Sequence, residues 1–412
     1  MSILKTIRTF TLVVVPFLAA LASAQVPVNA PMDSDQKAAV LKSMEDIITK
    51  RAYVPGVDFA KWPDLVKKHQ TGIDEAKDQV QFTNVMNSAL HEFGFSHIVL
   101  FSPQMADART SRGMVGLGVR IQLEDRGIRI VFVFPGTGAD EAGLREGDLI
   151  VAGDGKPVKT PADLTGEEGT KVKVTIERDG KPKDFVVTRR KFSTDIPETL
   201  KWSSDDTAVL TIPTFDLGYK KDNVAILMNE AMKAKYLVLD LRGNGGGAVT
   251  NLLHLANFFF DPTTPIGTFV NRPMAEMYSK ETSQPATDAI AVAAWAKDKL
   301  HTQYPKSEYF KGKVAVLVNG GTGSASEMMA AALKENLGAR LVGSKTAGAV
   351  LASLMTPISE KFLLQFPLMD YVTTKGYRIE GHGLEVDKVA PITKVGEADQ
   401  AVSIAVKLLQ SG

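Results

Sequence analysis

Two segments of the chain share an arrangement that strongly restricts how it can fold: a short apolar run, then a glycine-rich turn, then a helical stretch. The first spans residues 236–260 and has its turn at Gly243–Gly247; the second spans residues 314–337 and has its turn at Gly320–Gly323. Short apolar runs that alternate with helices are typical of the buried strands of an α/β core. The sequence therefore predicts such a core in the C-terminal half of the chain.

Composition narrows the function before any motif is considered. Of the 412 residues, 44% are hydrophobic and 23% are charged, as in ordinary globular proteins, and the length predicts two to three domains. The 48 basic and 47 acidic residues nearly cancel, so no net charge attracts nucleic acid or an anionic membrane. The absence of cysteine excludes disulfides, thiolate zinc sites and cysteine nucleophiles, and the six histidines form no HExxH pair. We expect no metal, no cofactor and no nucleic-acid partner.

The N-terminus has the layout of a secretory signal peptide. Lys5 and Arg8 precede an apolar run over residues 10–22, and small residues up to Ala24 offer a cleavage site. A membrane anchor is the alternative, but the run has 13 residues and contains Pro16, whereas a spanning helix needs ~20. We expect cleavage after Ala24, a periplasmic or secreted protein, and no integral membrane span.

After this N-terminal segment, the predicted secondary structure changes several times along the chain. Apolar residues at helical spacing predict helices over residues 35–50 and 74–93, and short β-branched runs between Gly, Pro and Asp turns predict a β-rich module. The predicted fold class is α+β multidomain. The predicted divisions are a signal peptide at 1–24, a linker at 25–34, an N-terminal helical domain at 35–107, the β-rich module at 108–192, and a core at 193–412 with an insertion at 263–311.

The β-rich module carries two glycine-containing motifs. The first is Gly116-Leu117-Gly118-Val119, and the second is the run A-G-L-x-x-G-D-x-I over residues 142–150. A Gly-x-Gly loop can turn several backbone N–H groups toward one carboxylate, and the strand beside it can accept an extended peptide. The module resembles a PDZ domain, so the first motif is a candidate peptide-binding site. A β-hairpin-rich domain without a ligand is the alternative.

The turn before the second core helix contains a candidate nucleophile. Ser324 follows the glycine turn and begins the helix, so its oxygen and the next N–H groups would lie at the positive end of that helix. Nucleophile turns in other hydrolases have this placement. Taken alone, Ser324 and Glu327 also fit a capping box of the S-x-x-E type.

The first glycine turn is a candidate oxyanion site. Its glycines allow backbone N–H groups to approach a ligand closely, and Asp240 before the turn is predicted to hold the loop in place. Residues 243–248 also satisfy a loose G-x-G-x-x-A dinucleotide pattern, but the acidic residue expected on the next strand is missing. No G-K-[ST] sequence follows, which excludes a Walker loop.

Together these motifs resemble peptidase family S41, the C-terminal processing and tricorn-core group. The resemblance rests on the Asp-Leu-Arg-x-Asn-x-Gly-Gly run from Asp240, on Gly-Ser-Ala-Ser-Glu from Gly323, and on the late strand-turn over residues 376–387. It implies a helical N-terminal part, a PDZ module and a ClpP/crotonase-like α/β core. It also implies a serine endopeptidase acting on unfolded or C-terminally recognised polypeptides, with PDZ gating and Ser324 as nucleophile.

The sequence departs from one branch of this family. The Ser–Lys branch carries its base in a T-x-G-K turn, but the turn here ends at Ala349 in place of the lysine. The tricorn-like branch uses a histidine from a Ser-His step and a glutamate from a late E-x-x-G turn. Those positions are Ser96, His97 and Glu380 in this sequence. The resemblance therefore implies His97 as general base, with Ser96 and Glu380 orienting it.

Serine chemistry gives each group a task. A hydroxyl is a weak nucleophile that needs a positioned base, and an imidazole with a pKa of about 6.5 suits that task near neutral pH. The backbone N–H groups of Ala325 and of Gly246 or Gly247 would hold the oxyanion. Lys345, just before the threonine of the T-x-G turn, and His382 remain alternative bases.

Two other functions stay open at this point. Ala349 is compatible with a catalytically inactive peptide-binding protein, in which His97 would be a buried structural histidine among apolar neighbours. The crotonase-like core is compatible with an acyl-CoA enzyme, although the PDZ module and the signal peptide argue against it. The sequence leaves the oligomeric state open.

Overall fold

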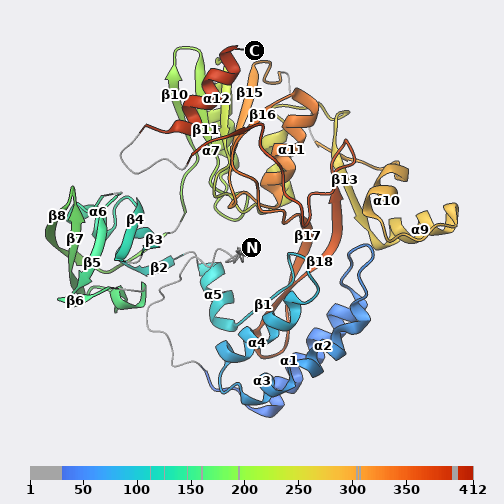
Figure 1. The fold of residues 1–412 in the computed structure, drawn as a ribbon, viewed down its shortest axis with the longest axis horizontal. Helices are drawn as coiled ribbons and strands as arrows, with labels where there is room; N and C mark the ends of the chain where they lie inside the picture. Colours follow the sequence, from blue (N-terminus) through green and yellow to red (C-terminus); the bar gives the residue numbers. More distant parts are fainter. Residues whose placement is uncertain are drawn as a thin grey trace, which may run out of the picture.

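The computed structural model describes residues 30–411, except 112, 125, 146, 159–160, 194, 303–304, 306–307 and 392–397. The predicted signal peptide and residues 25–29 of the predicted linker lie outside the described residues. The chain forms an N-terminal helical part, a β-rich module that stands apart in Figure 1, and an α/β core. The predicted α+β multidomain class is confirmed.

The N-terminal part is built from short capped helices. The side chain of Asp78 accepts a hydrogen bond from the N–H of Gln81 at 2.8 Å and so starts a new helix. The segment predicted as one helix over 74–93 is therefore two. The elements are α1 (Ser34–Lys50), η1 (Phe59–Lys61), α2 (Trp62–Lys68), α3 (Gln70–Glu75), α4 (Gln79–His91), β1 (Val99–Phe101) and α5 (Pro103–Ser111).

The N-terminal helices share their hydrophobic core with the C-terminal half of the chain. Met44 and Phe82 from the helices pack in one buried cluster with Phe362 and Phe366. Strand β1 also pairs antiparallel with β18 (Leu363–Val372). Residues 35–107 therefore have no separate core, and β1 places the segment around residue 97 beside the C-terminal strands.

The β-rich module has its own core around one antiparallel sheet, in the order β3-β4-β5-β7-β8, with β6 beside β5. A separate pair, β2 with β9, joins the two ends of the module. Its elements are β2 (Gly113–Gly116), β3 (Val119–Glu124), β4 (Gly127–Val133), α6 (Gly138–Ala142), β5 (Leu149–Gly153), β6 (Lys156–Pro157), η2 (Pro161–Leu164), β7 (Lys171–Arg178), β8 (Lys181–Thr188) and β9 (Arg190–Ser193).

The α/β core is a sheet in the order β10-β11-β12-β15-β16-β19, parallel except for β10. Because β12 and β15 are parallel neighbours, the turns that follow them meet at one edge of the sheet. The elements are β10 (Thr199–Ser204), β11 (Thr207–Thr211), α7 (Lys221–Ala231), β12 (Tyr236–Asp240), α8 (Val249–Ala256), β15 (Lys313–Val318), α11 (Ala325–Leu337), β16 (Arg340–Gly343), β19 (Lys388–Val389) and α12 (Gln400–Ser411).

Helices cover both faces of this sheet. On one face, α7, α8 and α11 pack against residues such as Leu239 and Val316. On the other face, α12 packs Ala401, Ala405 and Leu409 against Val238 and Leu317. Both faces of the central strands are therefore buried, which explains their continuous apolar runs.

A second sheet joins the core to the N-terminal part, in the order β1-β18-β13-β14, with β17 on β18. Strand β13 lies inside the predicted insertion at 263–311, yet it pairs with β18. The elements are β13 (Pro265–Asn271), α9 (Arg272–Thr282), α10 (Ala289–Trp295), β14 (Leu300–His301), β17 (Leu351–Pro357) and η3 (Ser359–Lys361). Of the helices in the described parts of the chain, none has the length and hydropathy needed to cross a bilayer.

Candidate active site

Ser324 lies at the tip of the turn between β15 and α11, in a strained backbone conformation. Its φ is 52° and its ψ is −123°, a region that residues with a side chain rarely adopt. The N–H of Ser324 donates to the carbonyl of Ala349 at 2.9 Å and to Glu327 Oε2 at 3.2 Å. The turn therefore presents a serine at a helix N-terminus, with the Glu327 half of the predicted capping box in place.

The carboxylate of Glu327 does more than cap the helix. It is buried, and it also accepts hydrogen bonds from Thr346 Oγ1, from Gly348 N at 2.9 Å and from Ala349 N at 3.0 Å. Burial raises the pKa of Glu327, and these hydrogen bonds act against that rise. Glu327 thus ties the loop at 346–349 to the start of α11. The S-x-x-E motif indicated the cap, but nothing local in the sequence indicated this second role.

The glycine loop after β12 lies directly against Ser324. A side chain on Gly246 would collide with Ser324 and Ala325, and one on Gly247 would collide with the backbone of Phe215. The N–H of Gly246 donates to Asn244 Oδ1 at 2.9 Å. Among the described residues, no acceptor is paired with the N–H of Gly247 or of Ala325. Of the three predicted oxyanion donors, these two are the ones with no acceptor in the described part of the chain.

A continuous chain of hydrogen bonds connects His97, Ser96 and Glu380. Ser96 Oγ lies 2.6 Å from His97 Nδ1 and donates to Glu380 Oε2 at 2.9 Å. A hydroxyl has one proton, so Ser96 Oγ accepts from Nδ1–H of His97. The imidazole is thereby held in the tautomer whose Nε2 carries the free lone pair, as a general base requires.

Glu380 is the buried anchor of this chain. It also accepts from the N–H of Ser96 and from the N–H of Val350, each at 2.7 Å. Burial raises its pKa, while these hydrogen bonds favour the carboxylate. Val350 follows Ala349, whose carbonyl accepts from Ser324 N. One short segment, residues 349–350, therefore contacts both Ser324 and the carboxylate at the end of the hydrogen-bond chain from His97.

The protonation state of His97 follows from its surroundings. Burial lowers the pKa of His97 from its usual 6.5 to about 4, because the imidazolium would lose its hydration. The ring is therefore neutral near pH 7. Like Ser324, His97 has a positive φ, at 59°, so the Ser-His step is held in an uncommon backbone conformation.

The alternative bases lie in different settings. Lys345 is exposed and forms an ion pair with Glu385 at 2.7 Å, which raises its pKa, whereas a lysine base needs a lowered one. His382 is exposed, and its Nδ1 lies 2.9 Å from the carbonyl of Glu380. Among the described residues, Ser324 forms no hydrogen bond with Lys345 or His382, nor with His97.

The predicted peptide-binding residues lie together at the start of the module's edge strand. Gly118 has a φ of 89°, and a side chain there would collide with Thr137. The carbonyls of Leu117 and Gly118 accept from Ala139 and Phe134, at 2.8 and 2.9 Å. Gly116 ends β2 and Val119 begins β3. Within the described residues, no strand pairs with the outer edge of β3, which leaves room for an added strand.

Two segments of the chain match known protein families. Residues 206–390 match the model of peptidase family S41, and residues 115–188 match that of the PDZ domain. The chain is 31% identical over 289 residues to a "Probable CtpA-like serine protease" of Staphylococcus haemolyticus, covering 67% of this chain and 53% of that protein. A protein of the same name from Staphylococcus aureus is 30% identical over 286 residues, with the same coverage. The chain spans about half the length of the curated relatives it matches.

Solved structures share the fold. The photosystem II D1 C-terminal processing protease superposes with a TM-score of 0.51 at 20% identity, covering 91% of this chain and 98% of that one. The tricorn protease superposes with a TM-score of 0.52 at 14% identity, covering 92% of this chain and 37% of that one. At these identities the likeness concerns the fold alone.

Proposed function

The chain carries a peptidase family S41 core at residues 206–390 and a PDZ domain at residues 115–188, and from this premise we propose that it is a serine endopeptidase of the Ser-His-Glu type. The observation that carries the proposal is the hydrogen-bond chain from His97 through Ser96 to Glu380. Glu380, at the end of this hydrogen-bond chain, accepts from Val350 N, and the adjacent Ala349 accepts from Ser324 N.

In the proposed mechanism, Ser324 Oγ attacks the scissile carbonyl and His97 Nε2 takes the hydroxyl proton. Ser96 and Glu380 hold the ring in the required tautomer and stabilise the imidazolium that forms. The N–H groups of Ala325 and Gly247 donate to the oxyanion of the tetrahedral intermediate, and removing one such donor typically costs ~10²–10³ in rate. His97 then returns the proton to the leaving amine, and water completes the cycle by attack on the acyl-enzyme.

The proposed substrates are polypeptides, unfolded or recognised at the C-terminus by the PDZ domain. The free edge of β3 beside Gly116–Val119 supports this, since an extended peptide can add there as a strand. We place the protein in the periplasm or outside the cell, on the basis of the signal-peptide pattern at residues 1–24.

The proposal includes gating by the PDZ domain. Arg109, on the helix that leads into the domain, forms an ion pair with Asp216 at 2.7 Å. The neighbouring Phe215 donates its N–H to the carbonyl of Gly246 and accepts from Ala248 N, each at 2.9 Å. Through these contacts, a movement of the PDZ domain would be transmitted to the glycine loop. They therefore support a PDZ domain that controls access to the site, and not one that is only attached to the core.

The test is hydrolysis of casein and of a peptide with an apolar C-terminus, by the wild type and three variants. We expect Ser324→Ala and His97→Ala to abolish cleavage and Lys345→Ala to retain it. A fluorophosphonate probe should label the wild type at Ser324 and leave Ser324→Ala unlabelled. A wild type that binds the peptide but neither cleaves it nor reacts with the probe would contradict the proposal and identify a peptide-binding protein.

A further inference from the structure

We infer that Asp399, at the start of the C-terminal helix α12, is a positioning residue for the glycine loop beside Ser324. The inference rests on the proposed function, because that function gives the loop its oxyanion-binding role. Asp399 lies beyond residues 206–390, the segment that matches the family model. The contact therefore joins the site to a part of the chain that none of the catalytic motifs includes.

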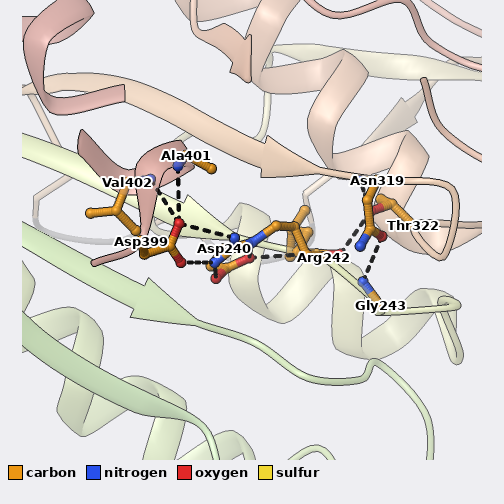
Figure 2. A network of polar contacts seen from close by, with 9 residues as sticks. Asp240, Arg242, Gly243, Asn319, Thr322, Asp399, Ala401 and Val402 are labelled. Atoms are coloured by element: carbon orange, nitrogen blue, oxygen red, sulfur yellow. Dashed lines mark hydrogen bonds and ion pairs between the residues drawn. The ribbon is translucent and has the colours of Figure 1, made fainter. Parts of the chain in front are cut away.

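Asp399 completes a triad of charges around Arg242, as Figure 2 shows. The guanidinium of Arg242 donates to Asp240 from Nε at 2.9 Å and from Nη2 at 2.5 Å. On its other side it donates to Asp399 from Nη2 at 2.7 Å and from Nη1 at 3.3 Å. Two carboxylates thus hold the planar fork from opposite sides, a geometry that restricts its orientation strongly.

The ion pairs around Arg242 stabilise the charged forms of Arg242 and Asp399. Burial works against the charge of Arg242, but hydrogen bonds to Asp240 and Asp399 outweigh it and raise the pKa of Arg242. Burial likewise works against the charge of Asp399, but Arg242 and two backbone N–H groups outweigh it and lower the pKa of Asp399. Both shifts favour the charged forms of Arg242 and Asp399, as the ion pair between them requires.

Helix α12 fixes the position of Asp399. Its carboxylate caps the helix by accepting from Ala401 N at 3.0 Å and Val402 N at 3.2 Å, as drawn in Figure 2. The helix in turn packs Ala405 and Leu409 on β12 and β15, the strands that lead into the two turns of the site. The cap and the packing of α12 therefore hold the carboxylate of Asp399 beside Arg242.

Arg242 is the second residue after β12, and the glycine loop begins immediately after it. The N–H of Gly243 donates to Asn319 Oδ1 at 2.9 Å (Figure 2). Thr322 Oγ1 donates to the carbonyl of Leu241 at 2.9 Å. The N–H of Gly323 donates to the carbonyl of Asn244 at 3.0 Å. The glycine loop and the turn that carries Ser324 are thus joined by several bonds, and the orientation of Arg242 sets where the loop begins.

The decisive variant is Asp399→Asn, because asparagine keeps the cap of α12 and loses the charge that holds Arg242. The matched control is Asp288→Asn, which changes an aspartate that caps α10 through Ile290 N at 2.8 Å, far along the chain from the site. For Asp399→Asn we expect kcat to fall roughly tenfold, the effect of weakening one charge-assisted hydrogen bond, with KM and the pH profile unchanged. Asp288→Asn should keep the wild-type kcat.

Amide hydrogen exchange supplies a readout that does not depend on activity. Asp399→Asn should exchange faster at residues 243–248, while the N-terminal helices keep wild-type protection. Unchanged exchange and unchanged kcat in an active protein would overturn the inference and leave the proposed function intact. A wild type without peptidase activity would overturn the proposed function, and faster exchange would then still support the positioning contact. A loss of protection throughout the chain would show a general stability role and would overturn the inference.

Discussion

A Cβ atom on Gly246 would lie 2.6 Å from the Cβ of Ser324 and 2.9 Å from the backbone nitrogen of Ala325. Carbon atoms pack at about 3.5–4.0 Å, so residue 246 can approach the serine this closely only without a side chain. The φ of Gly246, at 97°, is also one that other residues rarely adopt. The close contact between the glycine loop and the start of α11 therefore depends on this glycine.

Gly246→Ala should abolish peptidase activity, because the methyl group would push the loop away from the oxyanion position. Gly245→Ala is the matched control, since a Cβ there meets no atom within 4 Å and its φ is not in the left-handed region. We expect a loss of at least ~10²-fold in kcat/KM for the first variant, as for the loss of an oxyanion donor, and little change for the second. Equal activity of the two variants would contradict the role of the close contact.

Ser96→Ala should lower kcat by roughly 10²–10⁴-fold, the range attributed to general base catalysis, because His97 loses the partner that sets its tautomer. The backbone contact from Ser96 N to Glu380 remains, so the fold should be retained. Steady-state kinetics on a peptide measure the effect. Ser88→Ala, which removes an exposed helix hydroxyl, is the control and should behave as the wild type. Retention of full kcat in Ser96→Ala would show that the chain of hydrogen bonds has no catalytic role.

The acid limit of activity should lie unusually low for a histidine base. Burial lowers the pKa of His97 to about 4, so the free lone pair persists well below pH 6.5. We expect kcat/KM to hold between pH 7 and about pH 5 and to fall as the pH approaches 4. An acid limb centred at or above pH 6.5, measured on a stable peptide, would contradict this environment for His97.

The same shift predicts a pH dependence of stability. Because the pKa of His97 is lower in the folded state than in the unfolded one, the unfolded chain binds more protons between pH 6.5 and about 4. This residue therefore makes the free energy of unfolding fall as the pH drops through that window. Urea unfolding at pH 7 and pH 4.5 should show a larger fall for the wild type than for His97→Gln. Identical falls in the two proteins would contradict the prediction.

Glu327→Gln should destabilise the chain by about 1–3 kcal/mol, the usual cost of an unsatisfied buried group, because an amide cannot accept at both ends. Four donors face this carboxylate, from Ser324, Thr346, Gly348 and Ala349. Urea unfolding at pH 7 measures the change. Glu230→Gln, which breaks an exposed ion pair, should cost no more than about 1 kcal/mol. Equal stability of the two variants would show that Glu327 is not a structural anchor.

Local sequence patterns were sufficient to predict those elements of the fold that depend only on residues close together in the chain. The strand, glycine turn and helix around Ser324 can be read from the chain because each depends on the period and composition of a short segment. The motif at Gly116–Val119 likewise indicated the PDZ domain, which the family comparison confirms. The boundary between α3 and α4 was missed, because the cap at Asp78 competes with a continuous apolar pattern.

By itself, the sequence determined where the turns lie and which residues stand at their tips, because a turn depends only on a few consecutive residues. Only the tertiary structure decided which distant groups meet. Pairing of β1 with β18 brings Ser96 to Glu380, 284 positions away, and packing of α12 brings Asp399 to Arg242, 157 positions away. Such contacts depend on strand register and on a core shared by both halves of the chain, and neither leaves a trace in any single window of sequence.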